Sequence, residues 1–193
     1  MRRALKRAIG LLATILVLPW AALSGFGRFH QGFIFCAQAL SLVPGMPGSY
    51  FRVAFYSLTL EACGRDSHIA IGSYFSHAQA SVGNKVGIGA YCVLGKVSLG
   101  DNIQIASAVH VLSGNKQHTR DSEGRLTDDG AVYQRIAIGN DCWIGSGAII
   151  MANVGHKSTV AAGSIVTREV PGGVVVAGNP ARVLGARTDG PAV

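Results

Sequence analysis

The chain has 193 residues, of which 49% are hydrophobic and only 14% are charged, and its formal net charge is +7. This length fits one domain with an appendage. No basic stripe with interleaved aromatic residues is present, so the positive charge does not indicate nucleic acid binding. The four cysteines form no Cys-x-x-Cys pair, which argues against a zinc or redox motif of that kind, and we expect no disulfides.

The amino-terminal segment is first basic and then apolar. An uncharged run covers 8–23 and a second covers 32–43. Both are short for spanning helices, which need about 20 apolar residues each. A helical hairpin lodged in one leaflet fits better, so we expect residues 1–48 to associate with the membrane surface. The basic residues that would lie at anionic headgroups are Arg2, Arg3, Lys6 and Arg7.

Two other interpretations of this segment stay open. A cleaved signal peptide would have the same charge and core length, with Ala21-Ala22 as a weak cleavage site. Alternatively, a pair of helices could pack against the body of the protein or between subunits.

A short amphipathic helix is expected over 49–63, ended by Gly64. We expect this helix to cover the open end of the domain that follows, because an uncovered end of a repeat domain exposes apolar surface. The residues that share its apolar face are Phe51, Phe55, Leu58 and Ala62. The predicted division is therefore a hydrophobic helical segment with its capping helix over 1–66, and a repeat domain over 67–193.

Within the repeat domain, aliphatic residues recur about every six positions. This period is neither the 3.6 of a helix nor the 2 of a simple strand. It predicts short strands separated by tight turns, with one aliphatic residue of each strand in a narrow core. An antiparallel β-sandwich is the alternative, but its strands alternate and its turns are less regular. The recurring residues are Val82, Ile88, Leu94, Leu99, Ile105 and Val111, and then Ile138, Ile144, Ile150, Val154, Val160 and Val166.

The period is lost over 112–135. This stretch is polar, charged and contains several glycines, so it predicts a loop that leaves the repeats. Long polar loops on a rigid scaffold often carry function.

The repeats resemble those of the hexapeptide-repeat acyltransferases, in particular the sugar O-acetyltransferases. The resemblance covers most of 69–184. It is most specific at 138–145, which reads Ile-Gly-Asn-Asp-Cys-Trp-Ile-Gly, and at 177–183, which reads Ala-Gly-Asn-Pro-Ala-Arg-Val. It implies an all-β fold, a left-handed parallel β-helix of hexapeptide repeats, here with an N-terminal hydrophobic helical appendage. This handedness is an exception to the usual right-handed crossover.

In that family a histidine lies on the loop that leaves the coils, after an Ile-Gly-Asp-Asn coil. The corresponding run here is 99–102, Leu-Gly-Asp-Asn, and His118 is the matching histidine, with His110 as the runner-up. Imidazole titrates near pH 6.5, so it can accept a hydroxyl proton and then protonate a departing thiolate. The resemblance therefore implies His118 as general base in a direct transfer within a ternary complex. We expect a backbone N–H near Ser146 and Gly147 to stabilise the oxyanion.

The resemblance also implies acetyl-CoA as acyl donor, bound in a groove between two subunits of a homotrimer. The tryptophan and the serine of the matching set would lie near the thioester, and the alanine would contact the pantetheine through its backbone. The threonine and the two arginines would approach the nucleotide, where guanidinium pairs well with phosphate. The matching positions are Trp143, Ser146, Ala162, Thr167, Arg168 and Arg182.

We therefore expect an acetyl-CoA-dependent O-acyltransferase that needs no metal and acts on a sugar hydroxyl of a lipid-linked or polymeric glycan. One alternative is a small soluble acceptor such as serine. Another is a metal-dependent β-helix enzyme of the carbonic-anhydrase type, for which His77, His110 and His118 are the candidate ligands. A third is a non-catalytic scaffold. The basic amino terminus and a cytosolic acyl donor together predict the cytoplasmic face of a bacterial inner membrane.

Overall fold

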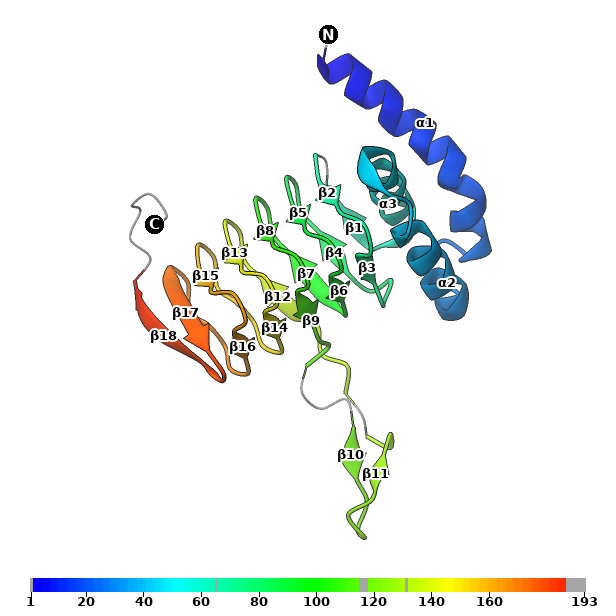
Figure 1. Ribbon diagram of the computed structural model, residues 1–193. Helices are drawn as coiled ribbons and strands as arrows, with labels where there is room; N and C mark the ends of the chain where they lie inside the picture. The colour runs from blue at the N-terminus through cyan, green and yellow to red at the C-terminus, as the bar shows by residue number, and fades with distance from the viewer. Residues whose placement is uncertain (1, 65, 115–117, 131, 187–193) are drawn as a thin grey trace.

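The computed structural model describes residues 2–64, 66–114, 118–130 and 132–186. Three helices come first, and a solenoid of short strands follows them (Figure 1). The helices are α1 (Arg2–Leu23), α2 (His30–Ser41) and α3 (Gly45–Thr59). Parts of three sequence predictions lie outside the described residues: position 65 at the domain boundary, 115–117 and 131 in the excursion, and 187–193 at the end of the repeat domain.

Successive strands of the solenoid go to three different sheets, and each of the first four coils contributes one strand to each sheet. Further along the chain, the first of these sheets continues through isolated bridges at Val154 and Val170. Sheet 1 contains β1 (Ala62–Cys63), β4 (Ser81–Val82), β7 (Val97–Leu99) and β12 (Ile136–Ile138). Sheet 2 contains β2 (His68–Ile69), β5 (Gly87–Ile88), β8 (Gln104–Ile105), β13 (Trp143–Ile144), β15 (Thr159–Val160), β17 (Val174–Gly178) and β18 (Ala181–Ala186). Sheet 3 contains β3 (Tyr74–Phe75), β6 (Val93–Leu94), β9 (His110–Val111), β14 (Ile149–Ile150) and β16 (Ile165–Val166).

The pairing register explains the six-residue period of the sequence. All neighbouring strands within these sheets are parallel except β17 and β18, which pair in the antiparallel sense. In sheet 2 the buried residue of each strand lies directly over that of the next coil, as Ile88 lies over Ile69 and Ile105 over Ile88. The predicted fold class, a parallel β-helix with N-terminal helices, is confirmed.

The first coil begins earlier than the sequence predicted. Helix α3 ends at Thr59, and Ala62, which we placed on its apolar face, belongs to strand β1. The reason is pairing, because Ala62 and Cys63 lie in register with Ser81 and Val82 of the next coil. Ala62 and Cys63 therefore already belong to the β-helix, ahead of the predicted start at 67.

Helices α2 and α3 close the amino-terminal end of the coils. Phe33 of α2 and Phe55 of α3 are buried with their rings 5.9 Å apart. Tyr56 packs edge-on against Phe75 of the first coil, and its hydroxyl accepts a hydrogen bond of 3.1 Å from the Phe75 amide. This burial raises the pKa of Tyr56 far above its ordinary value. Since one face of α2 is buried in this way, α2 is part of the cap.

A buried arginine joins the helices to the coils. Arg52 of α3 is only 1% exposed, and its Nε donates to the carbonyl oxygen of Ile69 at 3.0 Å. Its Nη1 donates to three carbonyl oxygens at the end of α2, where helical carbonyls lack intrahelical partners. Burial lowers the pKa of this guanidinium. The three acceptors are Leu40 at 3.0 Å, Ser41 at 3.2 Å and Val43 at 2.8 Å.

Helix α1 packs along α3 through one face only. Ala13, Val17 and Ala21 are buried, whereas the leucine and isoleucine side chains on the other sides are exposed. Among the described residues, none of the helices combines the length and the apolar character that crossing a bilayer requires.

We predict that Arg52→Met destabilises the protein by about 3 kcal/mol, because it leaves several buried carbonyl groups without donors. The measurement is the free energy of unfolding from urea denaturation followed by circular dichroism. The exposed Arg28 provides the matched control, and Arg28→Gln should change the free energy of unfolding by less than about 0.5 kcal/mol. Equal stabilities of Arg52→Met and the native chain would show that this network does not hold the cap.

Candidate active site

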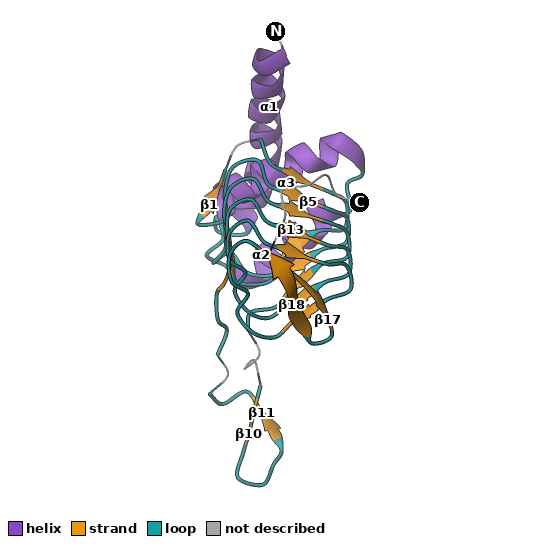
Figure 2. Cartoon of the chain, turned by 90° about the vertical axis from the view of Figure 1, so that its left-hand side faces the viewer, coloured by secondary structure: helices purple, strands orange, loops and turns teal. Residues whose placement is uncertain are grey.

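The excursion from the coils contains a hairpin that positions His118. Strand β9 ends at Val111 and β12 begins at Ile136, so the excursion occupies 112–135, the range over which the repeat is lost. Within it, β10 (Thr119–Arg120) pairs in the antiparallel sense with β11 (Leu126–Thr127). The hairpin extends well beyond the coils (Figures 1 and 2).

The hairpin register brings a carboxylate to the candidate base. Because Thr119 pairs with Thr127, the residues just outside this pair, His118 and Asp128, lie opposite each other. His118 Nδ1 is 2.9 Å from Asp128 Oδ1, and both side chains are well exposed. A carboxylate that accepts the Nδ1 proton leaves Nε2 as the proton acceptor, which is the arrangement that a general base needs.

Sequence reasoning did not identify Asp128. The signal was a turn inside the excursion, where the Asp121 carboxylate accepts hydrogen bonds from the amides of Glu123 and Arg125 at 2.9 and 3.0 Å. Recognising that turn would have predicted the hairpin and hence the pairing of His118 with Asp128.

The runner-up, His110, has a different setting. It lies on β9, its Cα is paired with those of Val93 and Ile149, and its side chain is exposed on the outer surface of sheet 3. No carboxylate partner of His110 is recorded among the described residues, whereas His118 has one.

Two predicted donor-site residues, Ser146 and Ala162, and the oxyanion candidate Gly147 gather at the corner where the chain passes from sheet 2 to sheet 3. Ser146 and Gly147 form the turn between β13 and β14, and Ala162 lies in the equivalent turn of the next coil. These turns are in close contact, since a Cβ atom at Gly145 would be 2.4 Å from the Ala162 nitrogen. Trp143, at 49% exposure, projects from sheet 2 just before the corner.

The expected oxyanion donor is only partly available at this corner. The Gly147 amide already donates to the Ser107 carbonyl oxygen of the preceding coil at 3.0 Å, so its N–H is engaged. The Ser146 side chain is exposed and can face a ligand. Gly147 itself has a φ of +69°, a conformation that favours glycine.

Thr167 and Arg168 lie at a different corner, between sheets 3 and 1. They line a cavity of about 520 Å³ together with Gln134 and Arg135. These two residues belong to the return arm of the excursion (132–135), which leads back to the coils at β12. The turn at 151–153 forms another wall of this cavity. Arg182 lies on β18, the terminal strand of sheet 2. The remaining lining residues are Ile136, Met151, Ala152, Asn153 and Glu169.

The predicted donor set is thus divided within one chain. The structure brings Ser146, Gly147 and Ala162 together at one corner and Thr167 with Arg168 at another, with Arg182 on the terminal hairpin. These two corners lie on opposite sides of sheet 3, so one chain presents them in different directions.

Sequence reasoning also missed a basic aromatic cluster beneath the return arm of the excursion. The ring of His77 lies 5.5 Å from that of His30 and 5.7 Å from that of Tyr133, measured between centroids. The Lys96 Nζ lies 5.7 Å from the Tyr133 centroid. Burial, and then the charges of Lys96 and His30, lower the pKa of His77. The signal in the sequence that could have indicated this cluster is Tyr133, the one tyrosine of the polar stretch 112–135.

The three candidate metal ligands lie in different parts of the structure. His77 lies in this cluster, His110 on sheet 3 and His118 beside Asp128. Within residues 2–64, 66–114, 118–130 and 132–186, no group of three or more histidine, cysteine or acidic side chains is placed to hold a metal ion.

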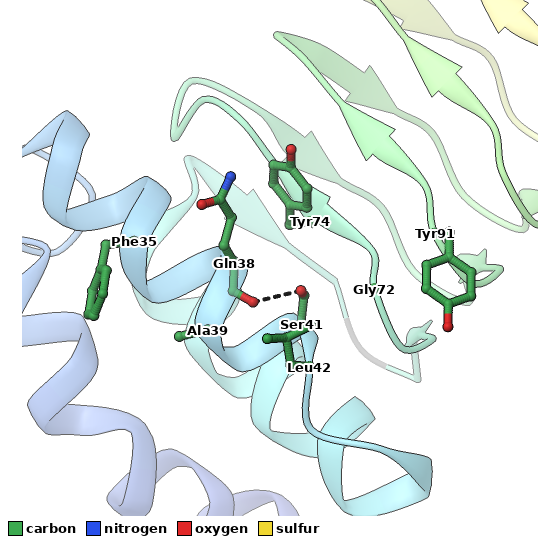
Figure 3. A pocket seen from close by; sticks show the side chains of 8 residues that line it. All are labelled: Phe35, Gln38, Ala39, Ser41, Leu42, Gly72, Tyr74 and Tyr91. Carbon is green, nitrogen blue, oxygen red and sulfur yellow. Dashed lines mark hydrogen bonds between the residues drawn. The ribbon is translucent and has the colours of Figure 1, made fainter.

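A second cavity, of about 460 Å³, lies between α2 and the first coils and contains none of the predicted site residues (Figure 3). Among its lining residues, the Ser41 hydroxyl donates to the Gln38 carbonyl oxygen at 2.6 Å (Figure 3). Tyr91, at the sheet 2–3 corner, lies over Gly72 so closely that a Cβ atom there would be 2.4 Å from the ring. The lining residues are Phe35, Gln38, Ala39, Ser41, Leu42, Gly72, Tyr74 and Tyr91.

Comparison with known proteins identifies relatives of the repeats. The family described as "Hexapeptide repeat of succinyl-transferase" matches residues 135–168. A putative acetyltransferase of Saccharomyces cerevisiae is 41% identical over 92 residues, which are 46% of this chain and 45% of the relative. Galactoside O-acetyltransferase of Escherichia coli is 41% identical over 92 residues, 46% of this chain and 43% of that enzyme. The matches thus span less than half the length of these curated relatives.

Solved structures extend the similarity to most of the chain. A galactoside acetyltransferase in complex with coenzyme A superposes with a TM-score of 0.70 and 26% identity, covering 86% of this chain and 83% of the other. A hexapeptide-repeat acetyltransferase of Vibrio cholerae in complex with acetyl coenzyme A has a TM-score of 0.62 and 23% identity, covering 72% and 77% of the two chains, and shares the fold. Taken together, the six-residue register, the excursion after β9 and these similarities show that the chain has the β-helix fold of the hexapeptide-repeat acetyltransferases and that its repeats are similar to theirs.

Proposed function

We propose that the protein is an acetyl-CoA-dependent O-acetyltransferase whose acceptor is a sugar hydroxyl of a lipid-linked or polymeric glycan. The observation that carries the proposal is the His118–Asp128 pair, set by the hairpin register on the excursion of the β-helix. The similarity to galactoside O-acetyltransferase supports acetyl transfer to a sugar hydroxyl. The apolar amino-terminal helix supports the lipid-linked or polymeric form of the acceptor, because a protein at the membrane surface is well placed to reach such a sugar.

In the proposed reaction His118 acts as general base. Its Nε2 accepts the proton of the sugar hydroxyl while the hydroxyl oxygen attacks the carbonyl carbon of the thioester. The tetrahedral intermediate collapses with cleavage of the C–S bond, and the imidazolium returns the proton to the thiolate sulfur. The products are the O-acetyl sugar and the free thiol of coenzyme A. Asp128 is a positioning residue, because it fixes the ring and stabilises its protonated form.

We further propose that the working unit is a homotrimer. The division of the donor set between two corners supports this arrangement, because a neighbouring copy can place its sheet 3–1 corner against the sheet 2–3 corner of the first. The phosphates of the donor would then meet Arg168 and Arg182, while Trp143 and Ser146 would lie by the acetyl end. The projecting hairpin would carry His118 to this junction rather than to a site within its own coils.

We predict that His118→Asn lowers kcat for acetyl transfer by about 100-fold or more, because the base is removed while the fold is retained. Asp128→Asn should lower kcat about tenfold, and the double variant should be little worse than His118→Asn, since the two residues act as a unit. The measurement is release of coenzyme A thiol in the presence of a galactoside acceptor.

The matched control is His110→Asn, which replaces the other candidate histidine and should retain most of the activity. Loss of activity in His110→Asn together with normal activity in His118→Asn would reverse the assignment of the base.

We predict that Arg168→Gln and Arg182→Gln each raise KM for acetyl-CoA about tenfold with a smaller change in kcat, because each removes a cationic partner of the donor phosphates. Lys85→Gln, which removes an exposed charge at another corner, is the control and should leave KM unchanged. Unchanged KM values in both arginine variants would place the nucleotide elsewhere.

A further inference from the structure

Helix α1 presents an exposed face that is entirely apolar. Every residue of 8–23 that is exposed is aliphatic, alanine or proline. Thr14 is the one residue of this stretch with a hydroxyl, and it donates that hydroxyl back to the Gly10 carbonyl oxygen at 2.9 Å. We call this surface the leucine face of α1. Its large members and their exposed fractions are Ile9 37%, Leu11 68%, Leu12 57%, Ile15 68%, Leu16 52%, Leu18 47% and Leu23 57%.

The opposite face of α1 is already occupied. Ala13, Val17 and Ala21 are each no more than 2% exposed, and α1 lies alongside α3 (Figure 1). The small side chains on this side allow close packing, and Trp20 also packs against the body, whereas the leucine and isoleucine side chains of the leucine face are exposed. The helix therefore has one free side, and any partner must approach along its length.

The charge of this region has a single sign. Residues 1–60 contain no aspartate or glutamate, and the first acidic residue of the chain is Glu61. Lys6 and Arg28, which flank the leucine face in sequence, are exposed. The segment has six lysine and arginine residues, and one of them, Arg52, is engaged in the internal network described above. They are Arg2, Arg3, Lys6, Arg7, Arg28 and Arg52.

We propose that the leucine face of α1 docks on an anionic lipid bilayer, with the helix axis in the plane of the membrane interface. An apolar stripe beside basic residues is the pattern of an interfacial helix, which gains from apolar burial and from attraction to anionic headgroups. A second copy of the chain is the less suitable occupant, because pairing two leucine faces would bring two uniformly basic segments together.

This proposal limits the membrane contact, which the sequence predicted over 1–48, to α1 and the turn that follows it. Phe33, Cys36 and Leu40 of α2 are buried in the cap, and Arg52 holds the end of α2. Helix α2 therefore does not leave the body to enter a leaflet, and α1 provides the contact. The turn after α1 adds Phe26 and Phe29, at 47% and 58% exposure. The lipid-linked form of the proposed acceptor rests on this contact, but acetyl transfer through His118 does not, so the membrane contact and the transfer reaction can fail separately.

The test is flotation of the full chain with lipid vesicles, without acetyl-CoA or sugar. The native chain should float with vesicles of phosphatidylcholine mixed with phosphatidylglycerol, and less with phosphatidylcholine alone. Leu12→Glu combined with Ile15→Glu should abolish flotation without changing the unfolding temperature, because both side chains are exposed. Leu126→Glu, at an equally exposed leucine of the excursion hairpin, is the matched control and should float normally.

Charge is tested separately. Replacing Arg2, Arg3, Lys6 and Arg7 by glutamine should weaken binding to the anionic vesicles about tenfold or more and should remove most of its salt dependence. Two results would overturn the proposal. One is a native chain that does not bind anionic vesicles. The other is a Leu12→Glu, Ile15→Glu variant that still floats but has a smaller mass by light scattering, which would assign the leucine face to a second copy.

Discussion

The structure depends on the stacking of one inward aliphatic side chain per strand onto its counterpart in the next coil. In sheet 2 this column runs from Ile69 through Ile144 to Val176, and all of these side chains are buried. A shift of one residue in any strand would turn its aliphatic residue outward and a polar one inward. The register is therefore held on all three sheets at once, and the corners of successive coils must also stack.

The stacked corners determine where surface side chains lie along the β-helix. At the corner between sheets 2 and 3, five successive turns have a residue with positive φ, so the backbone repeats from coil to coil. Side chains at this corner, such as Ser146, therefore lie at fixed positions along the axis of the β-helix. Only an excursion can place a group away from this edge, and the hairpin at 118–130 does so for His118. The residues of that column are Gly72, Tyr91, Ala108, Gly147 and Gly163.

Features that repeat along the chain could be predicted from the sequence, and features that depend on a single distant contact could not. The coils, the excursion over 112–135 and the positions of Trp143 and Arg168 on the coils follow from the period. Asp128 depends on the hairpin register, and the engaged Gly147 amide depends on a carbonyl in the preceding coil. The burial of Arg52 could not be predicted from its local sequence, because its acceptors come from α2 and β2.

The start of the coils shows the same distinction. Ala62 continues the helical pattern of α3 locally, but its partner Ser81 lies in the following coil and draws it into a strand. Helix α2 has the composition of a membrane segment, yet its buried face packs with Phe55. In both cases packing with a distant segment outweighs the local pattern.

The reversal of chain direction at β18 determines how long the solenoid can become. Parallel coils could in principle be added without limit, since each leaves an unpaired strand edge that invites another. β18 runs against β17, with an irregular step between Val175 and Val176, so it offers a mismatched template to any further parallel strand. With helices at the other end, the molecule is terminated on both sides, and filaments built by end-to-end strand addition are disfavoured.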